Sequence, residues 1–155
     1  MNIELLKDKG KLALVNKEYK EAIEAFSEVL AQEPGHQMAL FSRGTARFRL
    51  EDFAGAEEDF NAYLTLNDKN EKVYCSRGAA RLALKRFEEA MDDFNKAIEI
   101  SEFYPNAYFG RAELFFRVGE KKQGQEDYDV AVKLQQQRAQ SLLEGQGIMF
   151  QDPNS

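Results

Sequence analysis

The stretch FSRGTARFRLEDFAGAEEDF at residues 41–60 returns 34 positions later as CSRGAARLALKRFEEAMDDF at residues 75–94, with ten of its twenty residues unchanged. Self-similarity at a fixed period of this length is typical of proteins built by stacking one supersecondary unit on the next. In such proteins each unit buries its apolar face against its neighbours. The repetition therefore predicts an array of similar units in place of one irregular domain.

The same period continues in both directions without an insertion. Two positions of the repeat carry small residues and a third carries an aromatic residue. The three series are Gly10, Gly44, Gly78 and Ala112; Ala22, Ala56, Ala90 and Gly124; and Phe26, Phe60, Phe94 and Tyr128. Two helices that approach closely at the small residues, with the ring filling the remaining space, explain this pattern. The chain is therefore expected to contain four units.

Each unit divides into two predicted helices. In the first unit, apolar residues fall at helical spacing over residues 6–14 and again over residues 19–30. Asn16-Lys17-Glu18 forms a short turn between them, in which asparagine tolerates a left-handed backbone. Pro34-Gly35 ends the second helix, and Pro105 suits the first turn of a later one. The predicted fold class is all-α.

These residues resemble the tetratricopeptide repeat (TPR) family of helix-turn-helix units. We number the positions of each unit from Ile3, Gln37, Glu71 and Pro105, which puts the small residues at positions 8 and 20 and the aromatic residue at position 24. The Arg-Gly pair at positions 7 and 8 indicates an Arg-Gly variant of the repeat. The resemblance implies a right-handed superhelical α-solenoid with repeats at 3–36, 37–70, 71–104 and 105–134, a helical capping extension at 135–144, and a flexible tail at 145–155.

The composition argues against several functional classes. The net charge is −6, and the sequence contains no basic patch of the kind that binds nucleic acid or an anionic membrane surface. No apolar run approaches the ~18 residues of a membrane span. Cys75 is the only cysteine, so no internal disulfide can form. A reducing, cytoplasmic location is the simplest expectation.

An enzyme needs a constellation of reactive side chains, and the sequence shows none. His36 is the only histidine, and it follows Pro34-Gly35 in a turn, where an exposed loop residue is expected. One cysteine and one histidine do not make a metal cluster. We therefore predict no catalytic site, no cofactor and no metal.

Arginine and aspartate recur together at the repeat period. Position 7 holds Arg and position 23 holds Asp in units two to four, whereas unit one has Lys9 and Ala25. An arginine that faces neighbouring helices needs a partner, because an unpaired buried charge is costly. We predict structural ion pairs, within a unit or between neighbours, and consider a catalytic role improbable for a set repeated three times. The residues are Arg43, Asp59, Arg77, Asp93, Arg111 and Asp127.

The resemblance also implies a binding surface, because the first helices of TPR units line a concave groove. Contacts in that family tend to come from positions 2, 5, 9, 12 and 13. In this chain the apolar and cationic residues at those positions are Lys7, Lys11, Met38, Phe41, Phe48, Arg49, Lys72, Cys75, Leu82, Phe109, Phe116 and Arg117. We expect an apolar strip edged by cations, with Cys75 as a small apolar contact. The alternative is that the rings pack against the adjacent unit.

Two functions remain open. The first is a non-catalytic module that binds a peptide or helix of an unidentified protein in the groove. The second is a structural solenoid that forms homo-oligomers through its repeat ends or its C-terminal tail, where Ile148-Met149-Phe150 is apolar.

One TPR subgroup grips the acidic tails of heat-shock chaperones with Lys, Asn, Asn, Lys and Arg. The matching residues here are Lys7, Lys11, Ser42, Lys72 and Ser76. Both asparagines and the arginine are missing, which disfavours binding of chaperone tails.

Overall fold

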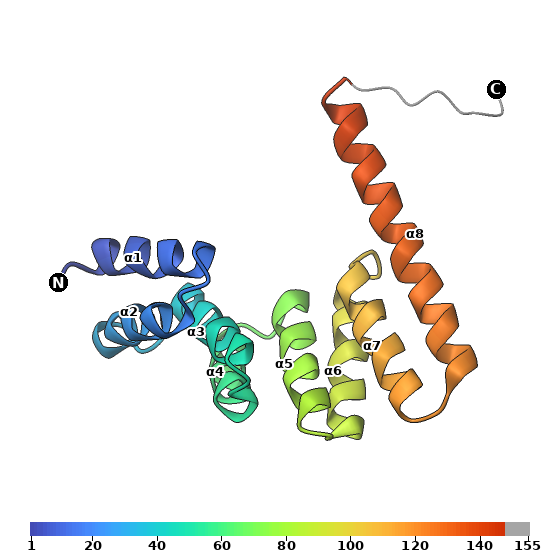
Figure 1. Ribbon diagram of the computed structural model, residues 1–155, viewed down its shortest axis with the longest axis horizontal. Helices are drawn as coiled ribbons and strands as arrows, with labels where there is room; N and C mark the ends of the chain where they lie inside the picture. Colours follow the sequence, from blue (N-terminus) through green and yellow to red (C-terminus); the bar gives the residue numbers. More distant parts are fainter. Residues whose placement is uncertain (148–155) are drawn as a thin grey trace.

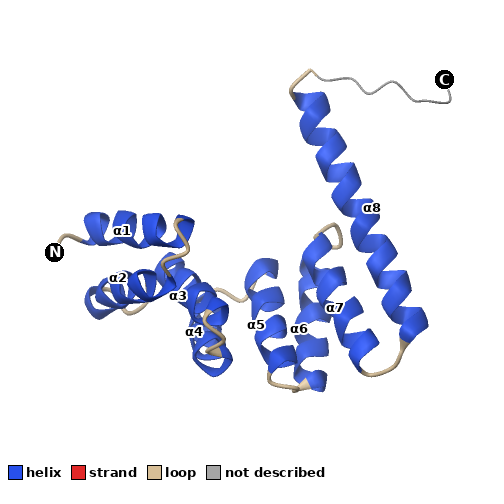
Figure 2. Ribbon diagram, viewed as in Figure 1, coloured by secondary structure: helices blue, strands red, loops and turns tan. Residues whose placement is uncertain are grey.

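The computed structural model describes residues 1–147 and shows eight α-helices, without a β-strand in that part of the chain. Figure 1 shows the helices following one another from α1 at one end to α8 at the other, and Figure 2 shows the short loops that join them. Their bounds are α1 Ile3–Val15, α2 Tyr19–Gln32, α3 Gln37–Arg49, α4 Phe53–Leu66, α5 Glu71–Ala83, α6 Phe87–Ile100, α7 Pro105–Arg117 and α8 Lys121–Gly145.

The helices form four pairs whose first members begin 34 residues apart. Each helix packs against the next one in the chain, and α5 also contacts α3 and α7. The first helices α3, α5 and α7 are thereby brought together along one side of the stack. This arrangement is an all-α helical repeat solenoid, as the period predicts.

The turn inside each pair closes with the same backbone geometry. Its left-handed residues are Lys17, Glu51, Lys85 and Gly119, with φ of 61°, 61°, 60° and 87°. The next residue in each turn donates its backbone N–H to a carbonyl five residues earlier, as Glu18 does to Ala13 over 2.8 Å. Asn16, in contrast, is right-handed with φ −80°. The expectation for asparagine was wrong because the helix end requires the left-handed conformation one position later.

The small residue at position 8 makes room for the ring at position 24. A Cβ atom added to Gly10 would lie 2.7 Å from the ring of Phe26, and one added to Gly44 would lie 2.6 Å from Phe60. Contacts this short do not occur, so the two helices approach as closely as they do because these positions lack a side chain. The rings of Phe26, Phe60 and Phe94 are fully buried.

The last helix differs from the other second helices in length. α8 has 25 residues, and it buries Gly124, Asp127 and Ala131 on its first half. It continues through residues 135–144 and projects beyond α7 (Figure 1). Side chains 135–142 are exposed, so a capping role for this extension remains a prediction. Most of the tail predicted at 145–155, with Ile148-Met149-Phe150, lies outside the described residues.

Candidate protein-interaction surface

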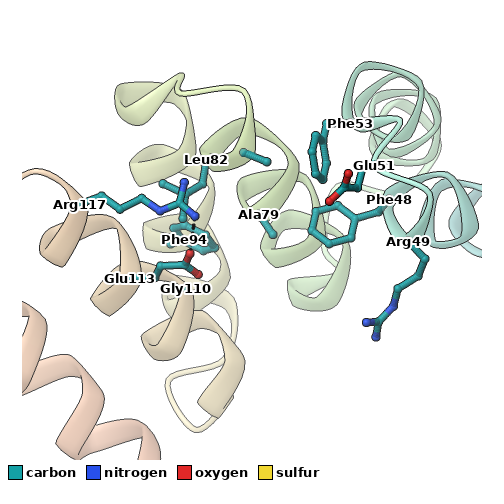
Figure 3. Close-up of a pocket in the computed structure, with 11 residues that line it drawn as sticks. Phe48, Arg49, Glu51, Phe53, Ala79, Leu82, Phe94, Gly110, Glu113 and Arg117 are labelled. Carbon is teal, nitrogen blue, oxygen red and sulfur yellow. Dashed lines mark hydrogen bonds and ion pairs between the residues drawn. The ribbon is translucent and has the colours of Figure 1, made fainter.

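The side of the stack formed by α3, α5 and α7 is hollowed (Figure 3). The hollow has a volume of about 340 Å³, and a second one of about 220 Å³ adjoins it and shares Phe48, Arg49 and Ala79. We call the two together the α3–α5–α7 groove. The larger hollow is lined by Phe48, Arg49, Glu51, Phe53, Ala79, Leu82, Ala83, Phe94, Gly110, Glu113 and Arg117.

Two aromatic rings form one wall of the groove and small residues form its floor. Phe48 on α3 and Phe53 on α4 meet edge to face, with ring centroids 5.2 Å apart. Across from them, Ala79 and Ala83 on α5 and Gly110 on α7 present little side-chain volume. Figure 3 shows the rings standing over this open space. The groove can therefore accept an apolar side chain from a partner.

The edge of the groove carries charges of both signs. Arg49 is exposed and points away from the two rings (Figure 3). Arg117 donates from Nη2 to Oε1 of Glu113 over 2.7 Å, across one turn of α7. Glu51 adds a second carboxylate beside the aromatic wall. The expected cationic edge is thus a mixed one, with Arg49 and Arg117 as exposed cations beside Glu51 and Glu113.

Only some of the predicted contact residues line this groove. Phe48, Arg49, Leu82 and Arg117 do so. Cys75 and Leu82 are 8% and 2% exposed, because both belong to a buried cluster with Ala107 and Leu114 of α7. The expectation that Cys75 and Leu82 are accessible contacts is therefore wrong, although Leu82 lies beneath the larger hollow. Burial also raises the pKa of the Cys75 thiol to about 12, which keeps it protonated and unreactive.

Besides Phe48, two of the four predicted phenylalanine contacts pack against an aromatic ring on the second helix of their own unit. Phe41 lies 5.9 Å from the ring of Phe60 and 6.3 Å from that of Tyr63. Phe109 meets Tyr128 edge to face at 5.5 Å. Both are half-buried and line neither hollow. The fourth, Phe116, is exposed at the end of α7.

The remaining predicted contacts lie outside the two hollows. Lys7 forms an ion pair with Glu4 at 2.8 Å. Met38 is half-buried, and its sulfur accepts a hydrogen bond from the Ser42 hydroxyl over 3.4 Å. Lys11 and Lys72 are exposed. Phe53 lines the groove but was not among the predicted contacts. The aromatic residue at position 17 of its unit was the signal in the sequence that could have indicated it.

The structure brings each recurring arginine to the aspartate of its own unit. The shortest contacts are 2.7 Å from Arg43 Nη2 to Asp59 Oδ1, 2.7 Å from Arg77 Nη2 to Asp93 Oδ1, and 2.7 Å from Arg111 Nε to Asp127 Oδ2. All three carboxylates are buried. Each pair joins the first and second helices of one unit with two or more hydrogen bonds.

The same arginines also reach back to the preceding unit. Nη1 of each one donates to a polar side chain at position 25 of the unit before it, and that position is always a serine or an asparagine. The bonds are Arg43 to Ser27 at 3.2 Å, Arg77 to Asn61 at 2.9 Å and Arg111 to Asn95 at 2.9 Å. Position 7 therefore connects three helices, two of its own unit and one of the previous unit.

A second arginine, at position 11, was missed by sequence reasoning. Arg47 Nη1 lies 3.1 Å from Asp59, and Arg81 Nη1 lies 3.0 Å from Asp93. Arg81 also donates from Nε to Glu57 over 2.7 Å, which links α5 to α4. Burial raises the pKa of the Asp93 carboxyl above its usual value, although both arginines act to lower it.

Within residues 1–147 there is no group of three or more histidine, cysteine, aspartate or glutamate side chains placed to hold a metal ion. None of the helices in that range is both long enough and apolar enough to span a bilayer. His36, predicted as an exposed loop residue, is the N-cap of α3, and its Nδ1 accepts from the Ala39 backbone over 3.3 Å.

Comparison with known proteins agrees with the geometry. Two family models described as tetratricopeptide repeat match residues 7–71 and 71–104. The first TPR domain of Spaghetti (RPAP3), solved with the HSP90 peptide SRMEEVD, is 31% identical, with a TM-score of 0.66 over 80% of this chain and 90% of that one. The chain is thus a helical repeat protein, and it belongs to the tetratricopeptide repeat family.

More distant structures share the fold. The TPR domain of Arabidopsis OM64 is 28% identical, with a TM-score of 0.71 over 74% of this chain and 95% of that domain. A MamA chain from Desulfovibrio magneticus RS-1 is 18% identical, with a TM-score of 0.81 over 88% of this chain and 77% of its own. A search of curated proteins gave no match.

Proposed function

We propose that this protein is a non-catalytic interaction module that binds a segment of a protein partner in the α3–α5–α7 groove. The observation that carries the proposal is the groove itself, in which Phe48 and Phe53 face a floor of small residues. Apolar hollows with a few polar groups at the edge are the usual form of a peptide-binding site. A cytoplasmic location, expected from the single cysteine, belongs to the same proposal.

The chemistry of the groove favours a segment with one apolar anchor and an acidic neighbour. A methionine, leucine or phenylalanine fits between the aromatic wall and Ala79. An acidic residue beside the anchor would reach Arg49, whose guanidinium is exposed. The HSP90 peptide SRMEEVD, bound by the related domain of Spaghetti, has this combination of a methionine and acidic residues.

The segment need not be a chaperone tail. Ser42 and Ser76 stand where the chaperone-binding subgroup has an asparagine and an arginine. Lys72, which matches a lysine of that subgroup, lines neither hollow. We therefore expect SRMEEVD to bind more weakly than peptides selected for this groove. The comparison of the two separates general peptide binding from recognition of a terminal carboxylate.

The test is to select peptides on the protein from a random library and to measure their affinity by fluorescence anisotropy, with SRMEEVD alongside. Ala79→Arg fills the floor of both hollows, and we expect it to weaken binding by at least about tenfold. Ala62→Arg, on an exposed site of α4, is the matched control and leaves affinity unchanged. Equal affinity of the Ala79→Arg variant and the wild type, with both folded by circular dichroism, would rule out the groove.

Self-assembly through the repeat ends is a second candidate function. The observation that favours it is the exposure of Leu5 and Leu12 on α1, at positions that are buried in every other unit. Large apolar side chains left exposed together on one face mark a surface that binds protein.

A further inference from the structure

The first helix exposes residues at positions that are buried between units elsewhere in the stack. Leu5 and Leu12 occupy positions 3 and 10 and are 57% and 62% exposed. The same positions in units two to four are at most 2% exposed, because the preceding unit packs against them; they are Ala39, Val73, Ala107, Ala46, Ala80 and Leu114. Terminal units of repeat proteins usually carry a polar outer face. On α1 this face is mixed, because Leu5 and Leu12 lie beside Asp8 and Lys9, and it keeps the two apolar positions that are buried between units elsewhere.

The opposite end of the stack also exposes residues whose equivalents are buried in the interior. Tyr128 on α8 is 46% exposed, whereas the rings at its position in the first three units are at most 1% exposed. Phe116 on α7 is 42% exposed, whereas Leu82, its equivalent in unit three, is 2% exposed. The following unit provides the missing cover in the interior of the stack, and unit four has none among the described residues.

We propose that these two ends bind each other, so that α1 of one copy docks on the α7–α8 face of a second copy in the register of consecutive units. The inference specifies the contact for the second candidate function and does not depend on peptide binding in the groove. In that register Leu5 and Leu12 of one copy would become covered, and so would Tyr128 and Phe116 of the other. Leu114, buried at position 10 between units three and four, shows that this interface accepts a leucine where Leu12 would lie.

The charges at the two ends complement each other at one repeated contact. Between consecutive units, the residue at position 7 donates to the residue at position 25 of the unit before it, as Arg77 does to Asn61. At the ends of the chain these positions hold Lys9 and Asp129, one cation and one carboxylate. Both are exposed, and Asp129 accepts a bond from the Gln125 amide over 2.8 Å. The proposed register therefore replaces a neutral acceptor with an ion pair.

A second pair of positions agrees with the same register. Gly110, at position 6, packs against the ring of Phe94, at position 24 of the preceding unit. At the chain ends these positions hold Asp8 and Tyr128. In the proposed register the carboxylate of Asp8 could therefore accept a hydrogen bond from the hydroxyl of Tyr128. The phenylalanines at position 24 of the other units have no such hydroxyl. Around Leu12 the facing residues would be Lys121 and Gln125, in place of Phe87 and Met91, and would contribute their aliphatic stems.

This contact joins two different surfaces, so each copy keeps one of each available. A head-to-tail contact of this kind produces chains whose length grows with concentration, or a ring if the rotation closes. Face-to-face dimers, in contrast, stop at two copies. The distribution of sizes in solution therefore distinguishes the two arrangements.

The test uses charge reversal at two exposed sites, followed by analytical ultracentrifugation over a range of concentrations. We expect Lys9→Asp alone, or Asp129→Lys alone, to weaken self-association by at least about tenfold. The chain carrying both changes regains it, because the ion pair is restored with reversed polarity. An equimolar mixture of the two single variants regains it as well. Association that neither single variant weakens would overturn the inference, and so would a wild-type chain that stays monomeric.

Two further variants separate this contact from other modes of assembly. Leu12→Asp is expected to abolish association, whereas Leu142→Asp, equally exposed at 62% but on the extension of α8, leaves it intact. A chain ending at Gly147 is expected to associate as the full chain does. If it does not associate, α1 binds the C-terminal residues and not the α7–α8 face, and the inference is wrong. Peptide affinity of the Lys9→Asp variant reports separately on the groove.

Discussion

Replacing Arg77 by alanine is the most informative perturbation of the fold. The Arg77 side chain is 17% exposed and donates to both oxygens of Asp93, which is 3% exposed, while Nη1 holds Asn61 of the preceding unit. The substitution removes both connections from one position. It leaves a buried carboxylate with a single cationic partner, Arg81, whose Nη1 lies 3.0 Å away.

The expected loss of stability follows from that remaining partner. Removing one member of a buried ion pair costs about 3–5 kcal/mol when the other is left alone. Because Arg81 still neutralises Asp93, we expect a loss of about 2–3 kcal/mol. Arg117→Ala, which breaks the exposed Arg117–Glu113 pair, is the matched control and is expected to cost less than about 1 kcal/mol.

The pH dependence gives a second, independent readout. Burial raises the pKa of Asp93, and Arg77 opposes this effect, so the variant has a still higher pKa at Asp93 in the folded state. A carboxyl whose folded pKa lies above its unfolded pKa stabilises the fold at low pH and loses that contribution as the pH rises. The deficit of Arg77→Ala relative to the wild type therefore shrinks as the pH falls from about 7 towards about 4.

The assay is urea unfolding followed by far-UV circular dichroism at several pH values. An unchanged unfolding midpoint for Arg77→Ala would show that the pair does not hold the two helices together. A deficit that is constant from neutral to acidic pH would show that the loss does not arise from the carboxylate of Asp93.

Three further predictions concern packing, backbone strain and the thiol. Gly44→Ala places a Cβ 2.6 Å from the ring of Phe60 and is expected to cost about 1–3 kcal/mol in urea unfolding; a neutral result would mean that the helices can separate freely. Lys85→Gly removes the backbone strain of a non-glycine residue in the left-handed conformation and is expected to stabilise the fold by up to about 1 kcal/mol. Gly119→Lys introduces the same strain, although the space around Gly119 is open, and is expected to cost about 1–2 kcal/mol. Changes of equal sign in the two variants would show that this backbone strain is absent. Because the pKa of Cys75 is about 12, its thiol should resist alkylation in the folded protein at a pH of about 8, and rapid labelling would contradict this. The stability that the protonated thiol contributes should be lost as the pH rises from about 8.5 towards 12. Cys75→Ala should make the stability fall less steeply over that pH range.

The repeat architecture could be predicted from the sequence because its determinants are local and recur. A glycine and a phenylalanine separated by 16 residues, as in Gly44 and Phe60, give the close approach of two helices each time they appear. The pairing of Arg77 with Asp93 could be expected because both residues are missing from the first unit. The joint presence of the arginine and the aspartate in three units, and their joint absence from the first, indicated the pairing within this one sequence.

The binding surface was harder to predict because it depends on how the units curve around one another. The position of Cys75 in its helix is that of a groove contact, yet α7 packs over it and buries it. Phe41 turns towards Phe60 in its own unit. Arg81, which bonds Asp93 and Glu57, has an equivalent in only one other unit, so the period gave no signal for it.

The most direct test of the proposed function is an NMR titration of the isotope-labelled protein with a library-selected peptide. The account predicts that the largest amide shift changes lie on the inner side of α3, α5 and α7, around Phe48, Ala79 and Gly110. Changes confined to α8, or to the outer faces of α2, α4 and α6, would contradict it.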